Sequence, residues 1–160
     1  LEKVLKQKQT LVLRDYHAEN LIWLPKRNKN KRVGLLDYQD ALAGHPAYDL
    51  ASLLKDARRD VSFKLRDELT HYFLKQTKFD KELFLRDYSI LSAQRNLKII
   101  GIFARLSIRD NKPGYLNLIP RVWKNLQDDL LHPSLTELSS FIKINVPEPT
   151  VSTLQKINSV

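Results

Sequence analysis

Short apolar runs separated by polar stretches fill the first forty residues of the chain. Residues 11–13, 21–24 and 33–36 are apolar and have the length of β-strands. The polar segment PKRNKNKR, residues 25–32, is typical of a solvent-exposed hairpin turn. The pattern predicts two short strands around a loop, and then a third strand that ends at Asp37.

After Pro46 the apolar residues recur with a helical period. Helices are predicted over residues 47–59, 64–77, 82–109, 115–131 and 134–142, and the end of a further helix over residues 1–9. The segment 82–109 allows either one helix or two.

The end of the chain has a different pattern. Residues 144–160 contain two prolines and little apolar periodicity, which predicts an extended or mobile tail. The domain prediction is a mainly helical lobe over residues 1–143, with a small β-hairpin region and a helical part at 46–143, followed by this tail.

The composition suits a single domain. The 160 residues are 42% hydrophobic, and a chain of this size buries roughly 70% of its unfolded surface. Because the sequence contains no Met, we do not expect it to be a complete translation product; the absence of Cys is compatible with a reducing cytosol. The most apolar stretch, residues 97–106, contains Lys98 and Arg105 and is too short to span a bilayer. We therefore expect a soluble, cytoplasmic protein without membrane contact.

The charge narrows the classes of partner. A formal net charge of +9 favours nucleotide phosphates, acidic sugars, nucleic acid or an anionic surface. It argues against an aminoglycoside, because a site for several ammonium groups would carry clustered acids. The five Lys and Arg residues of segment 25–32 lack interleaved aromatic residues, so a solvated turn is favoured over a nucleic-acid patch. Trp23 and Trp123 are expected to be packing residues.

Three oxygen-bearing side chains follow the apolar runs. Asp15 comes after the first run, Asn20 lies five positions later, and Asp37 ends the third run. Phosphoryl transfer needs a carboxylate that accepts the proton of the acceptor hydroxyl, and oxygen ligands for Mg²⁺. We therefore predict Asp15 as the catalytic base in a catalytic loop, 13–20. Asn20 and Asp37 are the predicted Mg²⁺ ligands, the latter in a metal loop, 37–40, with ATP as the donor.

The spacing matches the kinase pattern H-R-D-x-x-x-x-N in part. Asp15 and Asn20 are correctly spaced, whereas Leu13 stands where the pattern has histidine. Asp37 is followed by Tyr-Gln, where protein kinases have Phe-Gly.

The segments RDYHAEN, LLDYQDA and HPAYDLASLL resemble the catalytic half of the aminoglycoside phosphotransferase and choline kinase group of small-molecule kinases. Within that group, GHPAYDLASLLKDARRDV and AQRNLKIIGIFARL look most like the bacterial anomeric kinases of N-acetylmuramate and N-acetylglucosamine. The similarity covers about residues 11–133. It implies a protein-kinase-like C-terminal lobe, and ATP-dependent phosphorylation of the anomeric hydroxyl of these sugars in cell-wall recycling.

The resemblance also implies roles for residues near Asp15, Asn20 and Asp37. The family braces its catalytic loop with the Asp of a Tyr-Asp-Leu segment, which here is Asp49; the alternative is an acid favoured by a helix dipole. We expect Arg14 to brace an acid rather than bind phosphate, and His17 to be a hydrogen-bonded strut. A kinase of this group also needs an upstream lobe with a Gly-rich loop and a Lys, which these residues lack. We therefore expect the missing N-terminal lobe to be the partner of this chain, which alone would be inactive.

Substrate contacts are less constrained. Asp40 is either a turn residue or a contact to the metal shell or a sugar hydroxyl. Arg58, Arg59 and Arg95 are candidates to bind the carboxylate of muramate, because Arg recognises carboxylates through a bidentate fork. Asn96 is a further candidate for a substrate contact.

Other functions compete with an amino-sugar kinase. Within the same group, an aminoglycoside- or choline-type kinase is the alternative. From other classes, the alternatives are an inactive binding or regulatory half and a basic nucleic-acid-binding module, the latter motivated by the charge. The four histidines have no zinc-site spacing, so we expect no structural zinc.

Overall fold

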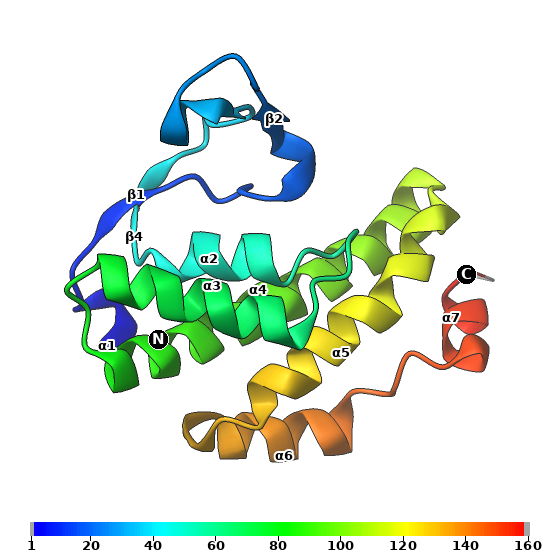
Figure 1. Ribbon diagram of the computed structural model, residues 1–160. Coiled ribbons are helices and arrows are strands. Elements are labelled where there is room, and N and C mark those ends of the chain that lie inside the picture. Colours follow the sequence, from blue (N-terminus) through cyan, green and yellow to red (C-terminus); the bar gives the residue numbers. More distant parts are fainter. Residues whose placement is uncertain (1, 159–160) are drawn as a thin grey trace. The chain divides into compact units, whose positions relative to one another are not determined.

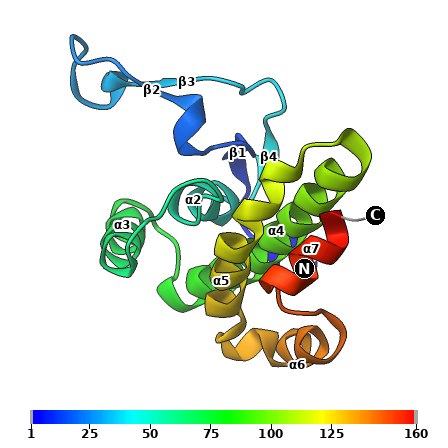
Figure 2. The ribbon, with the colours of Figure 1, turned by 90° about the vertical axis from the view of Figure 1, so that its right-hand side faces the viewer.

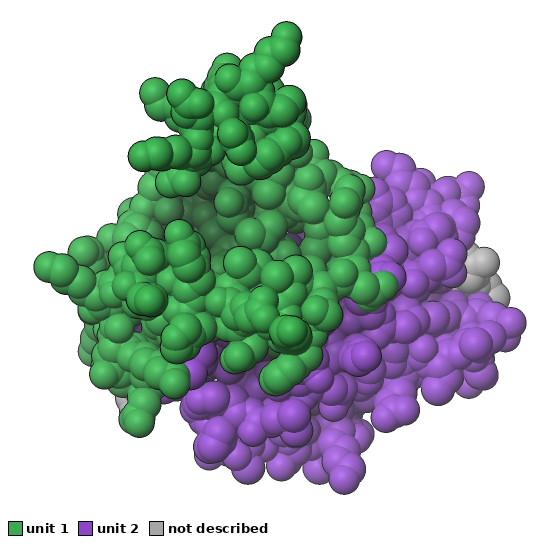
Figure 3. Space-filling model, viewed as in Figure 1, with its two compact units in different colours: residues 1–84 green, residues 85–160 purple. Residues whose placement is uncertain are grey.

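The computed structural model describes residues 2–158, which divide between Phe84 and Leu85 into two compact units, unit 1 before this point and unit 2 after it (Figure 3). Unit 1 contains α1 (Glu2–Leu5), β1 (Thr10–Val12), η1 (Ala18–Asn20), β2 (Leu21–Trp23), η2 (Lys29–Arg32), β3 (Val33–Leu35), β4 (Leu42–Gly44), α2 (Ala47–Leu54), α3 (Phe63–Gln76) and the start of α4 (Lys81–Asp110). Unit 2 contains the rest of α4, η3 (Pro113–Leu118), α5 (Ile119–Leu130), η4 (Pro133–Leu135), α6 (Thr136–Asn145) and α7 (Val151–Asn158). The predicted mainly helical fold with a small β region is confirmed (Figure 1).

The strands of unit 1 form two antiparallel pairs. The predicted hairpin is present, and it pairs β2 with β3 in the register Leu21↔Leu35. β1 pairs with β4 in the register Thr10↔Gly44, and β4 was not among the strands predicted from the sequence. A side chain at Gly44 would start 3.2 Å from Val12 Cγ2, so glycine allows the close approach of β4 to β1. The β2–β3 hairpin stands further from α2 than the β1–β4 pair does (Figures 1 and 2).

Helix α2 forms the apolar centre of unit 1. Ala47, Ala51 and Leu54 are each at most 1% exposed. Before the helix, His45 packs its ring 5.6 Å from the rings of Phe79 and Phe84, and its Nδ1 accepts the N–H of Ala47 at 3.2 Å. The imidazole therefore stabilises the start of α2 and has a packing role.

Helix α2 ends earlier than its apolar period predicts. The prediction extended to residue 59, whereas the helix ends at Leu54 and Lys55 has φ −121° and ψ 47°. The carboxylate of Asp56 then accepts the N–H of Arg58 at 2.9 Å, which is a local turn incompatible with a continuing helix. Ala57 is buried, as its apolar period suggested, but it lies in this turn.

The two following helices have distinct end signals. Ser62 caps α3, where its Oγ accepts the N–H of Leu65 at 3.3 Å. The long segment that allowed one helix or two is a single helix of 30 residues, α4. It ends at Asp110, and Asn111 follows in the left-handed region with a φ of 51°, where the N–H of Lys112 donates to the Leu106 carbonyl at 3.1 Å. No helix among residues 2–158 is long and apolar enough to cross a membrane.

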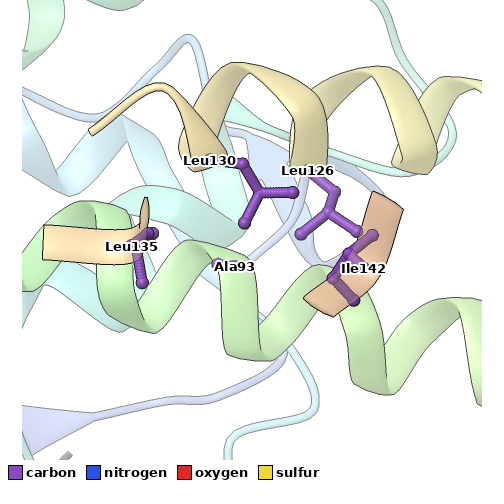
Figure 4. Packing of buried hydrophobic residues seen from close by; sticks show 5 residues of the cluster. All are labelled: Ala93, Leu126, Leu130, Leu135 and Ile142. Atoms are coloured by element: carbon purple, nitrogen blue, oxygen red, sulfur yellow. The ribbon is translucent and has the colours of Figure 1, made fainter. Parts of the chain in front are cut away.

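Unit 2 is held together by an apolar cluster. Ala93 of α4, Leu126 and Leu130 of α5, Leu135 of η4 and Ile142 of α6 are at most 7% exposed (Figure 4). Each large aliphatic side chain buried in this way contributes about 1.5–3 kcal/mol. Half-buried side chains pack against the cluster, and they include Trp123, as predicted.

The segment 144–160, expected to be extended or mobile, contains α7. The hydroxyl of Thr150 accepts the N–H of Thr153 at 3.2 Å, which caps the first turn. Apolar residues at Val151 and Leu154 then follow helical spacing. The two prolines precede this cap, so they do not interrupt the helix.

Candidate active site

The loop after β1 is built from consecutive tight turns. The N–H of Asp15 donates to the Leu13 carbonyl at 2.9 Å, and the N–H of His17 to the Asp15 carbonyl at 3.0 Å. Arg14 has a φ of 69°, in the left-handed region that a non-glycine residue rarely adopts. This conformation turns the chain immediately before Asp15, whose side chain is exposed.

Asn20 connects the three residues that the sequence grouped. Its Nδ2 donates to the backbone carbonyl of Asp15 at 2.9 Å and lies 3.5 Å from Oδ2 of Asp37. The carbonyl of Asn20 accepts the N–H of Leu36 at 2.9 Å, which fixes the end of β3 beside the loop. Asp15, Asn20 and Asp37 therefore lie next to one another, although 22 positions of sequence separate the first from the last.

The loop after β3, which the sequence predicted to bind a metal ion, begins with a second left-handed residue. Asp37 has a φ of 55°, and its Oδ1 accepts a hydrogen bond from the amide of Gln39. Asp40 is exposed, and it lies three positions further on. Arg14 and Asp37 thus both adopt a backbone conformation that is rare for residues other than glycine, and such residues are frequent at functional sites.

Asp49 holds the start of the catalytic loop. This residue lies in the first turn of α2, and both of its carboxylate oxygens accept backbone hydrogen bonds, from the N–H of Leu13 at 2.7 Å and from that of Arg14 at 2.9 Å. The geometry suits the predicted bracing role and is compatible with the helix-dipole alternative. Burial, together with the negative charge of Asp49, raises the pKa of Tyr16 in the same loop.

The other two predicted braces make different contacts. Arg14 contacts its neighbours through its backbone, since its N–H donates to Asp49 and its carbonyl accepts a hydrogen bond from Ser52 Oγ at 3.5 Å. His17 Nε2 lies 3.4 Å from Asn20 Nδ2. The Nδ1 of His17 is buried and has no hydrogen-bond partner in the part of the chain that the structure describes.

One carboxylate beside the loop was missed by the sequence analysis. Asp56 is 2% exposed, and its Oδ2 accepts the N–H of Ala18 at 3.3 Å. Nearby, the guanidinium Nε of Arg58 pairs with Glu19 at 3.1 Å. The sequence did contain a signal for this role: Asp56 follows the apolar face of α2 by two positions, and an Asp side chain is able to close a turn by accepting the N–H of the residue two positions later.

The candidate substrate residues fall in both units. Arg58 of unit 1 is paired with Glu19, and Arg59 is exposed. Arg95 and Asn96 of unit 2 are 6% and 1% exposed. The Nδ2 of Asn96 donates to Asp129 Oδ2 at 2.9 Å within a buried network that also contains Ser92. Contacts of these residues with a substrate stay predictions.

The side chains present suit a hard divalent cation shared with phosphates. Within the described chain, no group of three or more His, Asp or Glu side chains could hold a metal ion. Mg²⁺ is usually bound by one or two carboxylates and completed by phosphate oxygens and water. The carboxylate of Asp37 and the amide oxygen of Asn20 fit that pattern, because the Nδ2 of Asn20 is directed at protein acceptors.

The tip of the β2–β3 hairpin, at the end opposite Asn20 and Asp37, is basic and exposed. All residues from Lys26 to Lys31 are exposed, which agrees with a solvated turn. Trp23 is 63% exposed, and the guanidinium of Arg32 lies 6.0 Å from its ring. The prediction that Trp23 is a packing residue is therefore wrong, because β2 lies in a two-stranded hairpin whose Ile22, Trp23 and Val33 side chains are exposed.

Comparison with known proteins adds a family. The model of the "Phosphotransferase enzyme family" matches residues 1–89, which include Asp15, Asn20, Asp37 and α2.

Curated relatives share one name, "N-acetylmuramate/N-acetylglucosamine kinase". The chain is 48% identical to the protein of Caulobacter vibrioides over 138 residues, 86% of this chain and 38% of the relative. It is 38% identical to that of Pseudomonas aeruginosa over 152 residues, 89% of this chain and 43% of the relative. A protein of Neisseria meningitidis is 39% identical over 131 residues. The chain thus spans about two fifths of the length of the relatives that it matches.

Proposed function

Because this chain belongs to the phosphotransferase enzyme family, we propose that it is the catalytic, C-terminal lobe of an ATP-dependent small-molecule kinase. The names of the relatives support N-acetylmuramate or N-acetylglucosamine as the acceptor, and the proposed site of phosphorylation on that sugar is its anomeric hydroxyl. The observation that carries the proposal is the contact of Asn20 with both Asp15 and Asp37. It groups the three oxygen-bearing residues that phosphoryl transfer requires.

Asp15 is the proposed general base. Its side chain is exposed, while its backbone is held by turns and by Asn20. A carboxylate in this setting is accessible to an acceptor hydroxyl and is able to take its proton as the phosphoryl group is transferred. An anomeric hydroxyl is more acidic than an ordinary sugar hydroxyl, so a carboxylate is an adequate acceptor for its proton.

Asn20 and Asp37 are the proposed ligands of Mg²⁺. Their oxygen atoms are the hard ligands that this ion prefers, and the remaining positions would be filled by phosphate and water. When bound, the ion neutralises charge on the phosphates of ATP. The two residues would keep the ion beside Asp15, and the bond from Gln39 to Asp37 would fix the orientation of the carboxylate.

The formal charge of +9 also suits this substrate class. Muramate carries a lactyl carboxylate, which exposed arginines such as Arg59 attract. Aminoglycosides carry several ammonium groups, which a basic protein repels. The charge therefore favours the acidic amino sugar over the polycationic alternative.

The test is a substrate panel with the full-length protein. ATP consumption and formation of an anomeric phosphate, followed by ³¹P NMR, are measured with N-acetylmuramate, N-acetylglucosamine, choline and a kanamycin-like aminoglycoside. We expect the highest kcat/KM for one of the two N-acetylated sugars, with the Asp15→Asn protein as the control for contaminating activity. A higher kcat/KM for choline or the aminoglycoside would overturn the substrate assignment. ATP consumption with none of them would support an inactive binding half.

A further inference from the structure

The catalytic loop is held at two separate points by two different carboxylates. Asp49 accepts the N–H groups of Leu13 and Arg14, directly before Asp15. Asp56 accepts the N–H of Ala18, which lies two positions before Asn20. The base side and the metal side of the loop therefore have independent supports.

The Asp56 carboxylate is well fixed. Only 2% of the residue is exposed, and its Oδ1 accepts the N–H of Arg58 at 2.9 Å while its Oδ2 accepts that of Ala18 at 3.3 Å. A buried carboxylate that lost these bonds would keep its desolvation cost without compensation. The early end of α2 at Leu54 allows this arrangement, because a continuing helix would use the local backbone N–H groups itself.

The contact to Ala18 controls a short helical turn. Ala18 is the first residue of η1 and Asn20 is its last. The preceding residue, His17, provides no side-chain cap for this turn, so the acceptor comes from Asp56, 38 positions away. The Arg58–Glu19 ion pair ties the same two segments a second time at 3.1 Å. This pair is partly exposed and contributes little alone, so the Asp56 bond is the main tie.

We infer that Asp56 is a positioning residue for the proposed metal ligand Asn20. It acts through η1 and does not touch the reacting atoms. This inference rests on the proposed function, because it assigns Asn20 to the Mg²⁺ of the nucleotide. The two aspartates then have different roles: Asp49 orients the proposed base Asp15, and Asp56 orients the proposed metal ligand Asn20.

The kinetic test uses the full-length protein and the Asp56→Ala variant. Displacement of Asn20 weakens binding of Mg-ATP, so we expect its KM to rise roughly tenfold, the lower end for outer-shell residues of metal sites, and kcat to change less. The Asp49→Ala variant should show the reverse, with a larger fall in kcat than rise in this KM. The matched control is Asp67→Ala, which removes an exposed carboxylate of α3 and should change neither constant. An unchanged KM for Mg-ATP in Asp56→Ala, or a fall in kcat at constant KM, would overturn the inference.

A second measurement does not depend on activity. Amide hydrogen exchange in Asp56→Ala should accelerate at Ala18 and Asn20 and stay unchanged at Leu13 and Arg14. If the normal protein consumes no ATP with any acceptor, the proposed kinase function fails, and this exchange pattern alone decides whether Asp56 holds the turn. Equal exchange at Ala18 in the variant and the normal protein would contradict the inference.

A folding defect would not prevent the test. If Asp56→Ala does not fold, Asp56→Asn keeps one acceptor oxygen and most of the volume of the side chain. It should show a smaller change of the same kind, with faster exchange at Ala18 and a raised KM for Mg-ATP. Normal values for both in a folded Asp56→Asn protein would overturn the inference.

Discussion

The catalytic loop of unit 1 and the apolar cluster of unit 2 are stabilised by opposite means. The loop is fixed by carboxylates that accept hydrogen bonds from backbone N–H groups 35 to 38 positions away. The cluster is fixed by aliphatic side chains of neighbouring helices, each almost without exposure. Burial tolerates small shifts because it has no direction, whereas each hydrogen bond of the loop demands a particular geometry. Substitutions in the first region should therefore act on activity, and those in the second on stability.

The largest expected effect is a loss of catalytic activity in a protein that still folds. Asp15→Asn removes the proposed base but keeps the shape of an exposed side chain. We expect kcat to fall about 10²–10⁴-fold, with nucleotide binding and Tm almost unchanged. Steady-state kinetics, ATP titration and thermal unfolding measure the three quantities. Near-normal kcat in this variant would show that Asp15 is not the base.

The second prediction concerns the apolar cluster of unit 2, where a substitution should lower stability and leave nucleotide binding unchanged. Leu126 is fully buried, so Leu126→Ala should lower the free energy of unfolding by about 2–5 kcal/mol. The KM for ATP of the remaining folded protein should not change. Leu131→Ala is the control, since this neighbour is 83% exposed and its truncation should cost less than about 0.5 kcal/mol. Urea unfolding at equilibrium gives both values; equal losses would mean that the cluster is not what stabilises unit 2.

The third prediction sharpens the comparison within the site. Asp37→Ala removes a proposed Mg²⁺ ligand, and we expect roughly 10–100-fold weaker ATP binding in the presence of Mg²⁺. Binding without the ion should stay as weak as in the normal protein. Calorimetric titration of ATP with and without Mg²⁺ separates the two cases. The same Mg²⁺ dependence in both proteins would exclude Asp37 as a ligand.

The smallest effect concerns pH. Burial, and secondarily the charge of Asp49, raises the pKa of Tyr16 above its usual value of about 10. The unfolded chain therefore loses this proton first, so the contribution of Tyr16 to stability is complete below about pH 10 and is lost as the pH rises through the folded-state pKa. Urea unfolding in this range should show a shallower loss for Tyr16→Phe. Parallel curves for the two proteins would contradict the assignment.

The two regions also differed in how well the sequence predicted them. The helices of unit 2 were located from the period of Leu126, Leu130 and their neighbours, because packing repeats every three to four residues. The neighbourhood of Asp15, Asn20 and Asp37 was predicted because Asp15 and Asp37 each follow an apolar run and Asn20 directly precedes one.

Three features could not be predicted, and each depends on a partner distant in sequence or on local capping. Strand β4 is short and is defined by its pairing with β1. The sequence Leu42-Ala43-Gly44 has no alternation of apolar and polar residues that would predict a strand. The role of Asp56 requires knowledge that α2 ends at Leu54. Helix α7 depends on the Thr150 cap, which the nearby prolines obscured.

The left-handed backbone of Arg14 and Asp37 has a consequence for protein engineering. A non-glycine residue in this conformation costs on the order of 1 kcal/mol, whereas glycine adopts it freely. Directed evolution for heat resistance would therefore reward glycine at both positions, although it would lose the carboxylate of Asp37 and the side chain of Arg14. Libraries of this protein that are screened by melting temperature should keep Asp37 fixed, because selection there would favour stable molecules that have lost a proposed Mg²⁺ ligand.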